Sequence, residues 1–412
     1  MIYKIQTSPY IHASILLPAS KSISNRVLIL NALSKSLYPV GNLSDSDDTK
    51  VLLKALTSSG PDFDIEAAGT SMRFLTAYLS QREGEWTITG TERMKNRPVR
   101  ILVDALRELG AEINYLEKEG FPPLSIRGKS LTGGSVSLNG EVSSQYISAL
   151  MMIAPCLRDG LKLHLKGNII SKPYIQMTLR LMEAFEIQTI WKKRTIQIQP
   201  QSYRANPFSV ESDWSAASYW YEITALAGEN SSVDLSGLEK NSMQGDAEGQ
   251  NLFVPFGIRT VFTDKGVVLS KVADADLSRS PLTHNFIHEP DLAQTVIVTC
   301  CLLNIPFRFS GLQSLRIKET DRILALQTEM RKLGYVINDK SGNLMEWTGE
   351  RCVAEKNPVI STYEDHRMAM AFAPACLKTK EIRINHPQVV AKSYPNYWKD
   401  LSSAGFIITE EK

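Results

Sequence analysis

The sequence contains few cysteines, and they follow no recognisable pattern. The chain of 412 residues has five, without metal-binding spacing, and an odd number does not suit a secreted disulfide framework. They are Cys156, Cys300, Cys301, Cys352 and Cys376. The sequence also lacks a basic and apolar leader at its start, and its richest apolar run, 149–157, is too short to span a bilayer. We therefore expect a soluble protein of the reducing cytoplasm.

The charged residues show no excess of either sign. Lys and Arg number 46 against 44 Asp and Glu, so the net charge of +2 gives the whole protein little attraction for nucleic acid or an anionic membrane. Any strongly positive site must be local. The hydrophobic share of 43% and the charged share of 22% are ordinary for globular proteins, and the length predicts two or three domains.

An amphipathic helix followed by a strand, a polar turn and a second strand recurs along the chain. Clear copies occupy residues 98–127, 174–198, 247–269 and 320–344, and shorter versions occupy 48–65 and 395–408. We predict a mixed α/β (α+β) fold built by repetition, with three units in each half of the chain. This arrangement favours two similar lobes, with a polar crossover near residues 200–207.

The segment 18–26 (PASKSISNR) combines fixed positive charge with hydroxyl groups at a predicted helix start. Free backbone amides at a helix N-terminus bind anions, and Lys21 and Arg26 would strengthen such a site. The alternative is an ordinary helix that is capped by Ser20 and leaves both cations in solvent.

Other helix starts in the first half repeat this chemistry. Residues 69–73 (GTSMR) offer a glycine and two hydroxyls, 92–100 (ERMKNRPVR) contain four cations, and hydroxyls recur at 143–145 (SSQ) and 171–174 (SKPY). Each has an ordinary explanation, since Thr70 could cap a helix and a charge run is usually a solvated face. Together they are more than capping requires, and we expect an anion close to the backbone of Gly69.

The second half places carboxylates among its cations. Residues 316–322 (RIKETDR) contain three cations and two carboxylates, and we expect Thr320 to be the N-cap of the helix that follows. Lys318 and Arg322 would bind an anion while Glu319 acts as an acid or base. Ordinary ion pairing along a helix is the alternative.

A metal ion must be considered near Asp291. His284 and His288 lie four residues apart, with Glu289 and Asp291 nearby. We do not favour a metal, because no third His or Cys completes the pattern and Pro290 interrupts the helix that would align the pair. Asp291 begins an apolar helix, where a carboxylate is usually a partner of the helix dipole.

Seven motifs, taken in order over nearly the whole chain, resemble those of the enolpyruvylshikimate phosphate synthase family. They are 17–26 (LPASKSISNR), 45–48 (DSDD), 68–73 (AGTSMR), 142–145 (VSSQ), 170–174 (ISKPY), 316–322 (RIKETDR) and 365–370 (DHRMAM). The resemblance implies a transferase of the shikimate pathway, which leads to chorismate and the aromatic amino acids. Such an enzyme moves the enolpyruvyl group of phosphoenolpyruvate to the 5-hydroxyl of shikimate 3-phosphate and releases phosphate, through a tetrahedral intermediate.

The resemblance also implies an architecture. Each lobe would be an inside-out α/β barrel of three βαβαββ units, with the first unit truncated. The C-terminal lobe would comprise residues 1–20 and 212–412 and the N-terminal lobe 21–211, with the active site in the cleft between them and a hinge at 18–26. We expect a monomer that acts on small molecules, with no cofactor, no metal, and neither a nucleic-acid nor a membrane partner.

The resemblance assigns a role to each matching residue. Shikimate 3-phosphate would contact Lys21, Ser22, Arg26, Ser143, Ser144, Gln145, Ser171, Tyr174, Asp291, Ser314 and Lys318. Phosphoenolpyruvate would contact Lys21, Gly69, Arg97, Gln145, Arg322, Arg367 and Lys392. Asp291 would accept the hydroxyl proton, Glu319 would shuttle a proton at the methylene carbon, and Lys21 would donate a proton near the bridging oxygen.

Three residues depart from the family pattern. Ala67, Phe74 and Ser314 stand where Asn, Pro and Asn are usual, and the segment 52–69 is short, so we expect a lost hairpin there and a retained site. Gly69 favours sensitivity to glyphosate, an inhibitor of this family, and Ala67 weakens that expectation.

Two other functions stay open. The sibling transferase that acts on UDP-N-acetylglucosamine would be expected to carry a reactive cysteine, and residues 69–100 contain none. A non-catalytic anion-binding paralogue would not need Lys21, Asp291, Glu319 and Arg322 together.

Overall fold

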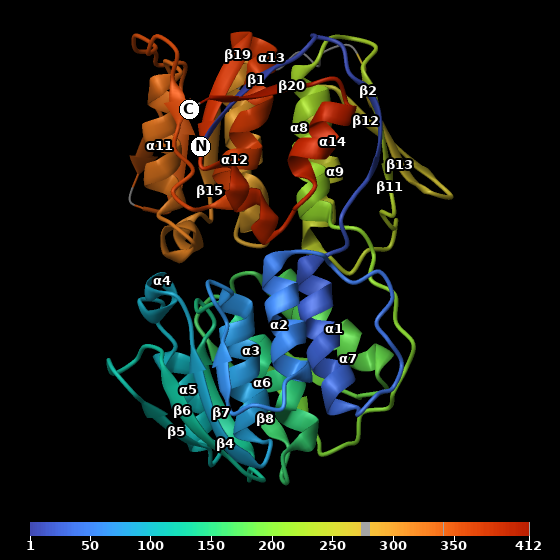
Figure 1. The fold of residues 1–412 in the computed structure, drawn as a ribbon, viewed down its shortest axis with the longest axis vertical. Coiled ribbons are helices and arrows are strands. Elements are labelled where there is room, and N and C mark those ends of the chain that lie inside the picture. The colour runs from blue at the N-terminus through green and yellow to red at the C-terminus, as the bar shows by residue number, and fades with distance from the viewer. Residues whose placement is uncertain (273–280, 341, 412) are drawn as a thin grey trace. The chain divides into compact units, whose positions relative to one another are not determined.

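The computed structural model describes residues 1–272, 281–340 and 342–411, and these fall into two compact units (Figure 1). The C-terminal unit comprises Met1–Pro18 and Glu211–Lys412, and the N-terminal unit comprises Ala19–Val210. The chain therefore passes from one unit to the other twice, after Pro18 and after Val210.

All the sheets of the described residues follow one pattern. In each, an edge strand runs parallel to its neighbour, and two further strands continue antiparallel. In the N-terminal unit the sheets are β3 (Asp62–Asp64), β4 (Gly84–Thr89), β6 (Leu124–Gly128), β5 (Glu112–Tyr115), and β7 (Gly134–Asn139), β8 (Leu161–Lys166), β10 (Thr195–Ile198), β9 (Ile190–Lys192). This recurrence confirms the predicted fold built from repeated units.

The C-terminal unit contains three such sheets within the described residues. They are β2 (His12–Leu16), β11 (Ser232–Ser236), β13 (Gly266–Lys271), β12 (Ile258–Thr263); β14 (Leu282–Asn285), β15 (Phe307–Ser310), β17 (Leu344–Trp347), β16 (Asn338–Lys340); and β18 (Val359–Ile360), β19 (Glu381–Asn385), β1 (Ile2–Gln6), β20 (Ile407–Glu411). Ser341, in the predicted hairpin of β16 and β17, lies outside the described residues.

The first two strands of the chain complete sheets made mostly from its second half. β2 pairs in parallel with β11, and β1 lies antiparallel between β19 and β20, with Ile5 opposite Ile382 and Ile408. In Figure 1 the blue start of the chain accordingly runs among the yellow and red segments of this unit. The strand that leads into the segment 18–26 thus belongs to the C-terminal unit.

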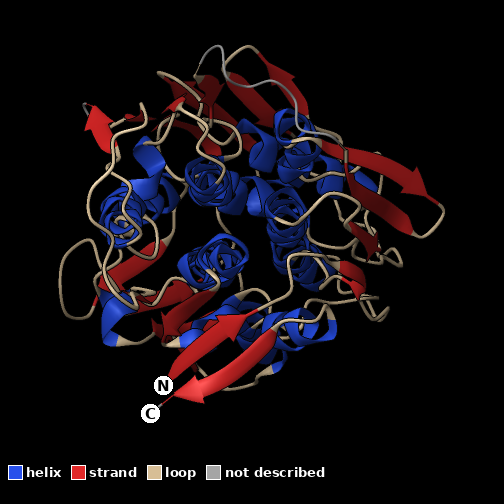
Figure 2. Ribbon diagram, turned by 90° about the horizontal axis from the view of Figure 1, so that it is seen from above, coloured by secondary structure: helices blue, strands red, loops and turns tan. Residues whose placement is uncertain are grey.

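Helices lie inside and strands outside in each unit (Figure 2). The N-terminal unit has α1 (Lys21–Leu33), α2 (Asp47–Thr57), α3 (Gly69–Ser80), α4 (Glu92–Lys95), α5 (Arg100–Glu108), α6 (Ser144–Ile153) and α7 (Lys172–Ala184). The C-terminal unit has α8 (Trp214–Leu226), α9 (Gly249–Leu252), α10 (Ala293–Leu302), α11 (Arg322–Lys332), α12 (His366–Phe372), α13 (Cys376–Thr379) and α14 (Tyr397–Ser403). The strands alternate in burial, as in β8, so one face of each sheet covers the helices.

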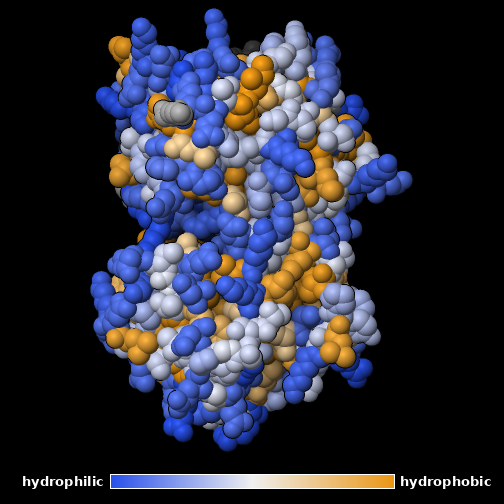
Figure 3. All heavy atoms as spheres, in the orientation of Figure 1, coloured by the Kyte–Doolittle hydropathy of each residue, from blue (hydrophilic) through white to orange (hydrophobic). Residues whose placement is uncertain are grey.

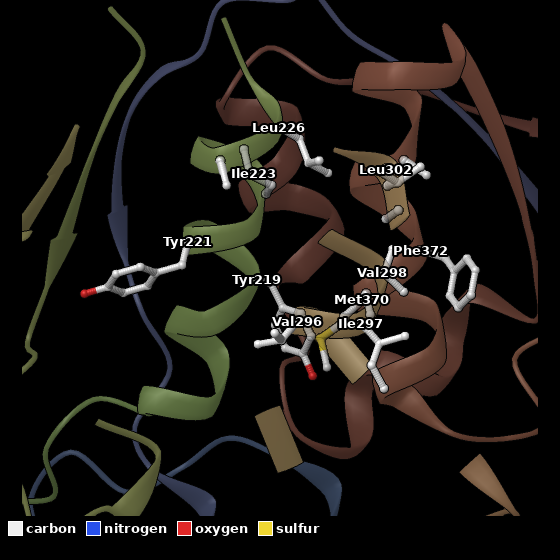
Figure 4. Packing of buried hydrophobic residues seen from close by; sticks show 14 of the residues in the cluster. Tyr219, Tyr221, Ile223, Leu226, Val296, Ile297, Val298, Leu302, Met370 and Phe372 are labelled. Atoms are coloured by element: carbon white, nitrogen blue, oxygen red, sulfur yellow. The ribbon is translucent and has the colours of Figure 1, made fainter. Parts of the chain in front are cut away.

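The core of the C-terminal unit lies where α8, α10 and α12 pack together (Figure 4). Every residue of α10 is buried, because a helix that is apolar all round can be accommodated only in a protein interior. Each fully buried Val, Ile or Leu side chain contributes roughly 1.5–3 kcal/mol. Tyr221 points away from the other labelled side chains, and its hydroxyl lies 2.9 Å from Thr260 Oγ1 of β12. These contacts hold the start of α8, which supports part of the site described below.

Hydrophilic residues cover most of the face drawn in Figure 3, and hydrophobic residues form separate patches on it. Large apolar side chains that are strongly exposed, such as Leu37 at 98% and Val353 at 95%, lie in loops. Among the described residues, no helix has both the length and the apolar character needed to cross a membrane.

Two predictions about local structure need correction. The predicted helix at 247–256 is broken into a 3₁₀ turn, the short α9 and a second 3₁₀ turn, Val254–Phe256, because Pro255 cannot donate a backbone hydrogen bond. The helix predicted to run from Phe74 begins five residues earlier, at Gly69. As expected, the described residues show no hairpin directly after α2, which is followed only by the short strand β3.

Candidate active site

The segment 18–26 begins α1 in the N-terminal unit. Ser20 is the N-cap, and its Oγ accepts a hydrogen bond from Ile23 N at 3.5 Å. Lys21 is the first helical residue, and its Nζ lies 3.2 Å from Oδ2 of the buried Asp48 in the first turn of α2. The capped-helix alternative is therefore right about Ser20 and wrong about Lys21, because this cation is held against a carboxylate.

Arg26 ties three helix starts together. Its Nη1 donates to Ser22 O at 2.8 Å, its Nε to Thr178 Oγ1 of α7 at 2.8 Å, and its Nη2 to Ser148 Oγ of α6 at 3.2 Å. Burial lowers the pKa of Arg26 to about 10, so it stays charged at neutral pH. Because these contacts join the second turns of α1, α6 and α7, the N-termini of the three helices lie at the same end of the unit.

The predicted serines lie at these helix starts. Ser143 caps α6 and accepts from Gln145 N at 3.3 Å, and the buried Ser144 begins that helix. Ser171 precedes α7 in the left-handed conformation, with φ of 51°, and Tyr174 lies in the first turn. The hydroxyls that the sequence predicts for an anion site therefore gather around helix N-termini.

Gly69 is the closest point of approach between α3 and the cation run. A β-carbon built on Gly69 would lie 2.6 Å from Arg97 Cζ and 2.7 Å from Arg73 Nη1, distances that real side chains do not tolerate. Thr70 is not the cap, since Ala68 holds that position, and it accepts a hydrogen bond from Gln145 Nε2 at 3.1 Å. The structure thus brings Gly69, Arg97 and Gln145 together.

In the C-terminal unit, three cations surround Asp291. The carboxylate lies 3.0 Å from Arg322 Nη1, 3.0 Å from Arg367 Nη2 and 3.5 Å from Lys318 Nζ. Burial alone would raise the pKa of Asp291, but the three cations overcome that effect and hold it well below its usual range. Asp291 is therefore a charged carboxylate with little affinity for a proton in this state.

Arg322 is the centre of this cluster. It is 1% exposed, and it pairs with Asp291, with Glu319 at 2.9 Å and with Asp365 at 2.7 Å. The carboxylates raise the pKa of Arg322 although burial acts to lower it. The predicted cap Thr320 was wrong: Asp321 caps α11 and accepts from Ile323 N and Leu324 N, because a carboxylate stabilises a helix N-terminus more strongly than a hydroxyl.

Comparison with known proteins identifies the family. Residues 60–401 match the family described as EPSP synthase (3-phosphoshikimate 1-carboxyvinyltransferase). The chain belongs to this family. The predicted family is confirmed, and with it the prediction that the protein is a transferase.

Relatives of this EPSP synthase family cover the whole length of the chain. A 3-phosphoshikimate 1-carboxyvinyltransferase of Bacteroides fragilis is 56% identical over 407 residues, 98% of each chain, and one of Vibrio cholerae is 35% identical over 96% of this chain and 97% of its own. A solved structure of EPSP synthase from Acinetobacter baumannii has a TM-score of 0.77 at 19% identity, covering 99% of this chain and 100% of its own. That structure supports the same fold.

The remaining predicted residues lie at the ends of 3₁₀ turns. Ser314 is in the turn Gln313–Ile317 and Lys392 ends the turn Pro387–Lys392, and both are partly exposed. Their contacts with substrates stay predictions. His284 Nε2 lies 2.6 Å from Glu289 Oε1, an arrangement that fixes the imidazole through a carboxylate.

Sequence reasoning assigned no role to several residues that the structure places in these clusters. Asp48 and Asp365 occur in the quoted motifs, and their positions at helix starts were the available signal. Tyr219, whose hydroxyl accepts a hydrogen bond from Arg367 Nη1 at 3.3 Å, lies inside an apolar helix where no pattern distinguishes it from other core residues (Figure 4).

Proposed function

We propose that this chain transfers the enolpyruvyl group of phosphoenolpyruvate to the 5-hydroxyl of shikimate 3-phosphate and releases phosphate. One observation carries the proposal: Asp291 and Glu319 share the guanidinium of Arg322, at 3.0 and 2.9 Å. Two carboxylates on one fixed cation offer both a proton acceptor and a proton donor beside a site for an anion.

The binding groups divide by chemistry. Hydroxyls and Arg26 at the starts of α1, α6 and α7 suit the phosphate and ring hydroxyls of shikimate 3-phosphate, and Gly69 with Arg97 suits phosphoenolpyruvate. Under this proposal both substrates also take ligands from the C-terminal unit, where Lys318, Arg322, Arg367, Lys392 and Ser314 serve. The near-neutral net charge of +2 is consistent with small anionic substrates and a cytoplasmic enzyme without a nucleic-acid partner.

The substrates would activate Asp291. Its cations hold its pKa well below the usual range, so it is a poor base without ligand. Substrate anions that engage Arg322, Arg367 and Lys318 weaken this hold, since each cation then divides its charge between two partners, and the proton affinity of Asp291 rises. Asp291 can then accept the proton of the 5-hydroxyl as its oxygen bonds to C2 of phosphoenolpyruvate.

Glu319 would serve both halves of the reaction. In the addition it gives a proton to the methylene carbon, which becomes a methyl group in the tetrahedral intermediate. In the elimination it takes a proton back from that methyl group as the bond to the phosphate oxygen breaks and the double bond re-forms. Lys21 supports the leaving phosphate as a cation near the bridging oxygen.

The test is phosphate release from phosphoenolpyruvate, measured with and without shikimate 3-phosphate. Release that depends on shikimate 3-phosphate supports the proposal. Release that depends on UDP-N-acetylglucosamine would replace it with the sibling activity. Binding of either substrate without turnover would identify an anion-binding paralogue.

A further inference from the structure

A second buried carboxylate, Asp246, lies beside the Asp291 cluster. It belongs to the 3₁₀ turn Gly245–Glu248 and is 3% exposed, and its Oδ2 accepts a hydrogen bond from Ser215 Oγ in the first turn of α8. Asp213 caps the same helix, accepting from Ser215 N at 2.7 Å. A carboxyl group so enclosed needs a reason, because burial strongly disfavours its charged form.

The packing of α8 brings this turn to Asp291. The helix packs against both the turn that carries Asp246 and the turn Pro290–Leu292 that carries Asp291, as well as against α10 and α12. One turn beyond Ser215, Tyr219 accepts from Arg367 Nη1, and the same nitrogen donates to Asp291 O at 3.2 Å. The start of α8 thus joins Asp246, Asp291 and Arg367.

The two carboxylates have opposite protonation. Burial, and next the charge of Asp291, raise the pKa of Asp246 to about 7, while Arg367 and Ser215 act in the lowering direction and Asp213 raises it further. Asp291 is held charged by Arg367, Lys318 and Arg322. Near neutral pH one member of the pair is therefore a charged base and the other exchanges a proton.

We propose that Asp246 is a positioning residue whose ionisation draws on Arg367 and thereby strengthens Asp291 as a proton acceptor. This inference rests on the role of Asp291 in the proposed function. While Asp246 is protonated, Arg367 is devoted to the Asp291 carboxylate. Once Asp246 is ionised, Arg367 is shared between two anions, and the new negative charge raises the proton affinity of Asp291.

The sign of the pH effect follows from the groups that face Asp246. They are Ser215 and Asp213 at the start of α8, Asp291 on its own turn and Arg367 on α12, with Glu319, Lys318 and Arg322 around Asp291. Glu248, on the same turn as Asp246, is exposed and accepts from Asn251 Nδ2 at 3.0 Å, away from this group. Turnover at saturating substrate should therefore rise as pH increases through neutrality.

The experiment compares kcat against pH for the unmodified chain, Asp246→Asn, Ser215→Ala and the matched control Glu248→Gln. We expect kcat of the unmodified chain and of Glu248→Gln to rise about tenfold between about pH 5.5 and 8. Asp246→Asn keeps the shape of the side chain and cannot ionise, so its kcat should change less than about twofold over the same range. Ser215→Ala removes a hydrogen bond to the charged form, so the rise should move to higher pH.

The outcomes separate this inference from the proposed function. If the unmodified chain releases no phosphate with shikimate 3-phosphate, the proposed function fails. If it turns over but Asp246→Asn retains the full rise with pH, only the role of Asp246 is overturned. Circular dichroism checks that Asp246→Asn is folded, and if it is not, an unmoved pH profile in Ser215→Ala overturns the inference by itself.

Discussion

The two units hold their cations in different ways. In the N-terminal unit, Arg26 donates to two hydroxyls and a backbone carbonyl. In the C-terminal unit, Arg322 pairs with the carboxylates of Asp291, Glu319 and Asp365. Both guanidinium groups are buried and both lie at helix starts, so the difference is in the charge of their partners.

This difference separates binding from proton transfer. A cation matched by neutral dipoles keeps its net positive potential for an incoming anion, and a unit-charge contact at ~4 Å is worth ~4 kcal/mol at an effective dielectric constant of 20. A cation matched by carboxylates is neutralised beforehand, and what it supplies is two oriented acid–base groups. The predictions below break or sharpen this contrast, from the largest expected effect to the smallest.

Arg322→Met should have the largest effect. It removes the shared partner of three carboxylates in a buried cluster, and uncompensated buried charge costs about 3–5 kcal/mol. We expect loss of turnover and a lower free energy of unfolding by that amount, measured by urea denaturation. Arg316→Met is the control, because Arg316 pairs with Asp321 and Asp339 near the surface and should cost about 1 kcal/mol or less. Equal losses in the two variants would contradict the special role of the Arg322 cluster.

Asp291→Asn and Glu319→Gln test the proton-transfer groups. Each keeps the side-chain shape, so substrate binding should persist while kcat falls about 10²–10⁴-fold, the usual contribution of acid–base catalysis. Rapid-quench and steady-state assays of phosphate release measure kcat, and calorimetry measures binding. Asp321→Asn is the control, since Asp321 faces Arg316 and helix amides, and its kcat should stay near that of the unmodified chain. Normal rates in either test variant would remove that residue from its role.

Gly69→Ala tests the binding side of the contrast. A methyl group 2.6 Å from Arg97 Cζ must displace this side chain, so the KM for phosphoenolpyruvate should rise about tenfold, equivalent to about 1.4 kcal/mol, with a smaller change in kcat. The inhibition constant of glyphosate should rise in the same variant. In the control Gly60→Ala the nearest atom, Ser58 Oγ, lies at an ordinary 3.6 Å, so KM should not change. A KM unchanged in Gly69→Ala would separate Arg97 from the phosphoenolpyruvate site.

Glu222→Gln compares the charged carboxylates of the site with a carboxyl group in the core. Glu222 is fully buried on α8, and burial raises its pKa well above its usual range. A raised folded-state pKa means that stability is highest below the unfolded-state pKa and falls as pH rises, by at most about 1.4 kcal/mol per pH unit. Glu222→Gln should abolish this part of the pH dependence and be about 1 kcal/mol more stable than the unmodified chain at about pH 8. Parallel urea midpoints for both proteins at about pH 5 and 8 would disprove it.

Local signals in the sequence located much of the candidate site. Helix starts are marked by short-range hydrogen bonding and by charge, so Ser20, Ser143 and the segment 316–322 could be recognised without a fold. The choice between Thr320 and Asp321 as a cap was missed, because two good capping residues stand side by side and only the packed helix selects one.

Other partners leave no local signal. Asp48 meets Lys21, and Asp365 meets Arg322, across 27 and 43 residues of sequence. Asp246 follows a glycine in a loop and resembles any surface carboxylate until α8 buries it. Such pairings depend on which helices lie next to one another, and periodicity within a helix does not contain that information.

The sequence alone determined the repeated strand and helix units, the cation-rich helix starts and, through seven ordered motifs, the family. These follow from local hydrogen bonding, periodicity and charge, which act over a few residues. Only the tertiary structure decided that β1 and β2 complete sheets of the C-terminal unit, that Arg322 serves three carboxylates, and that Asp246 lies beside Asp291. These depend on burial and on contacts between distant segments, because the pKa and the partner of a charged group are set by the low-dielectric surroundings into which the whole fold places it.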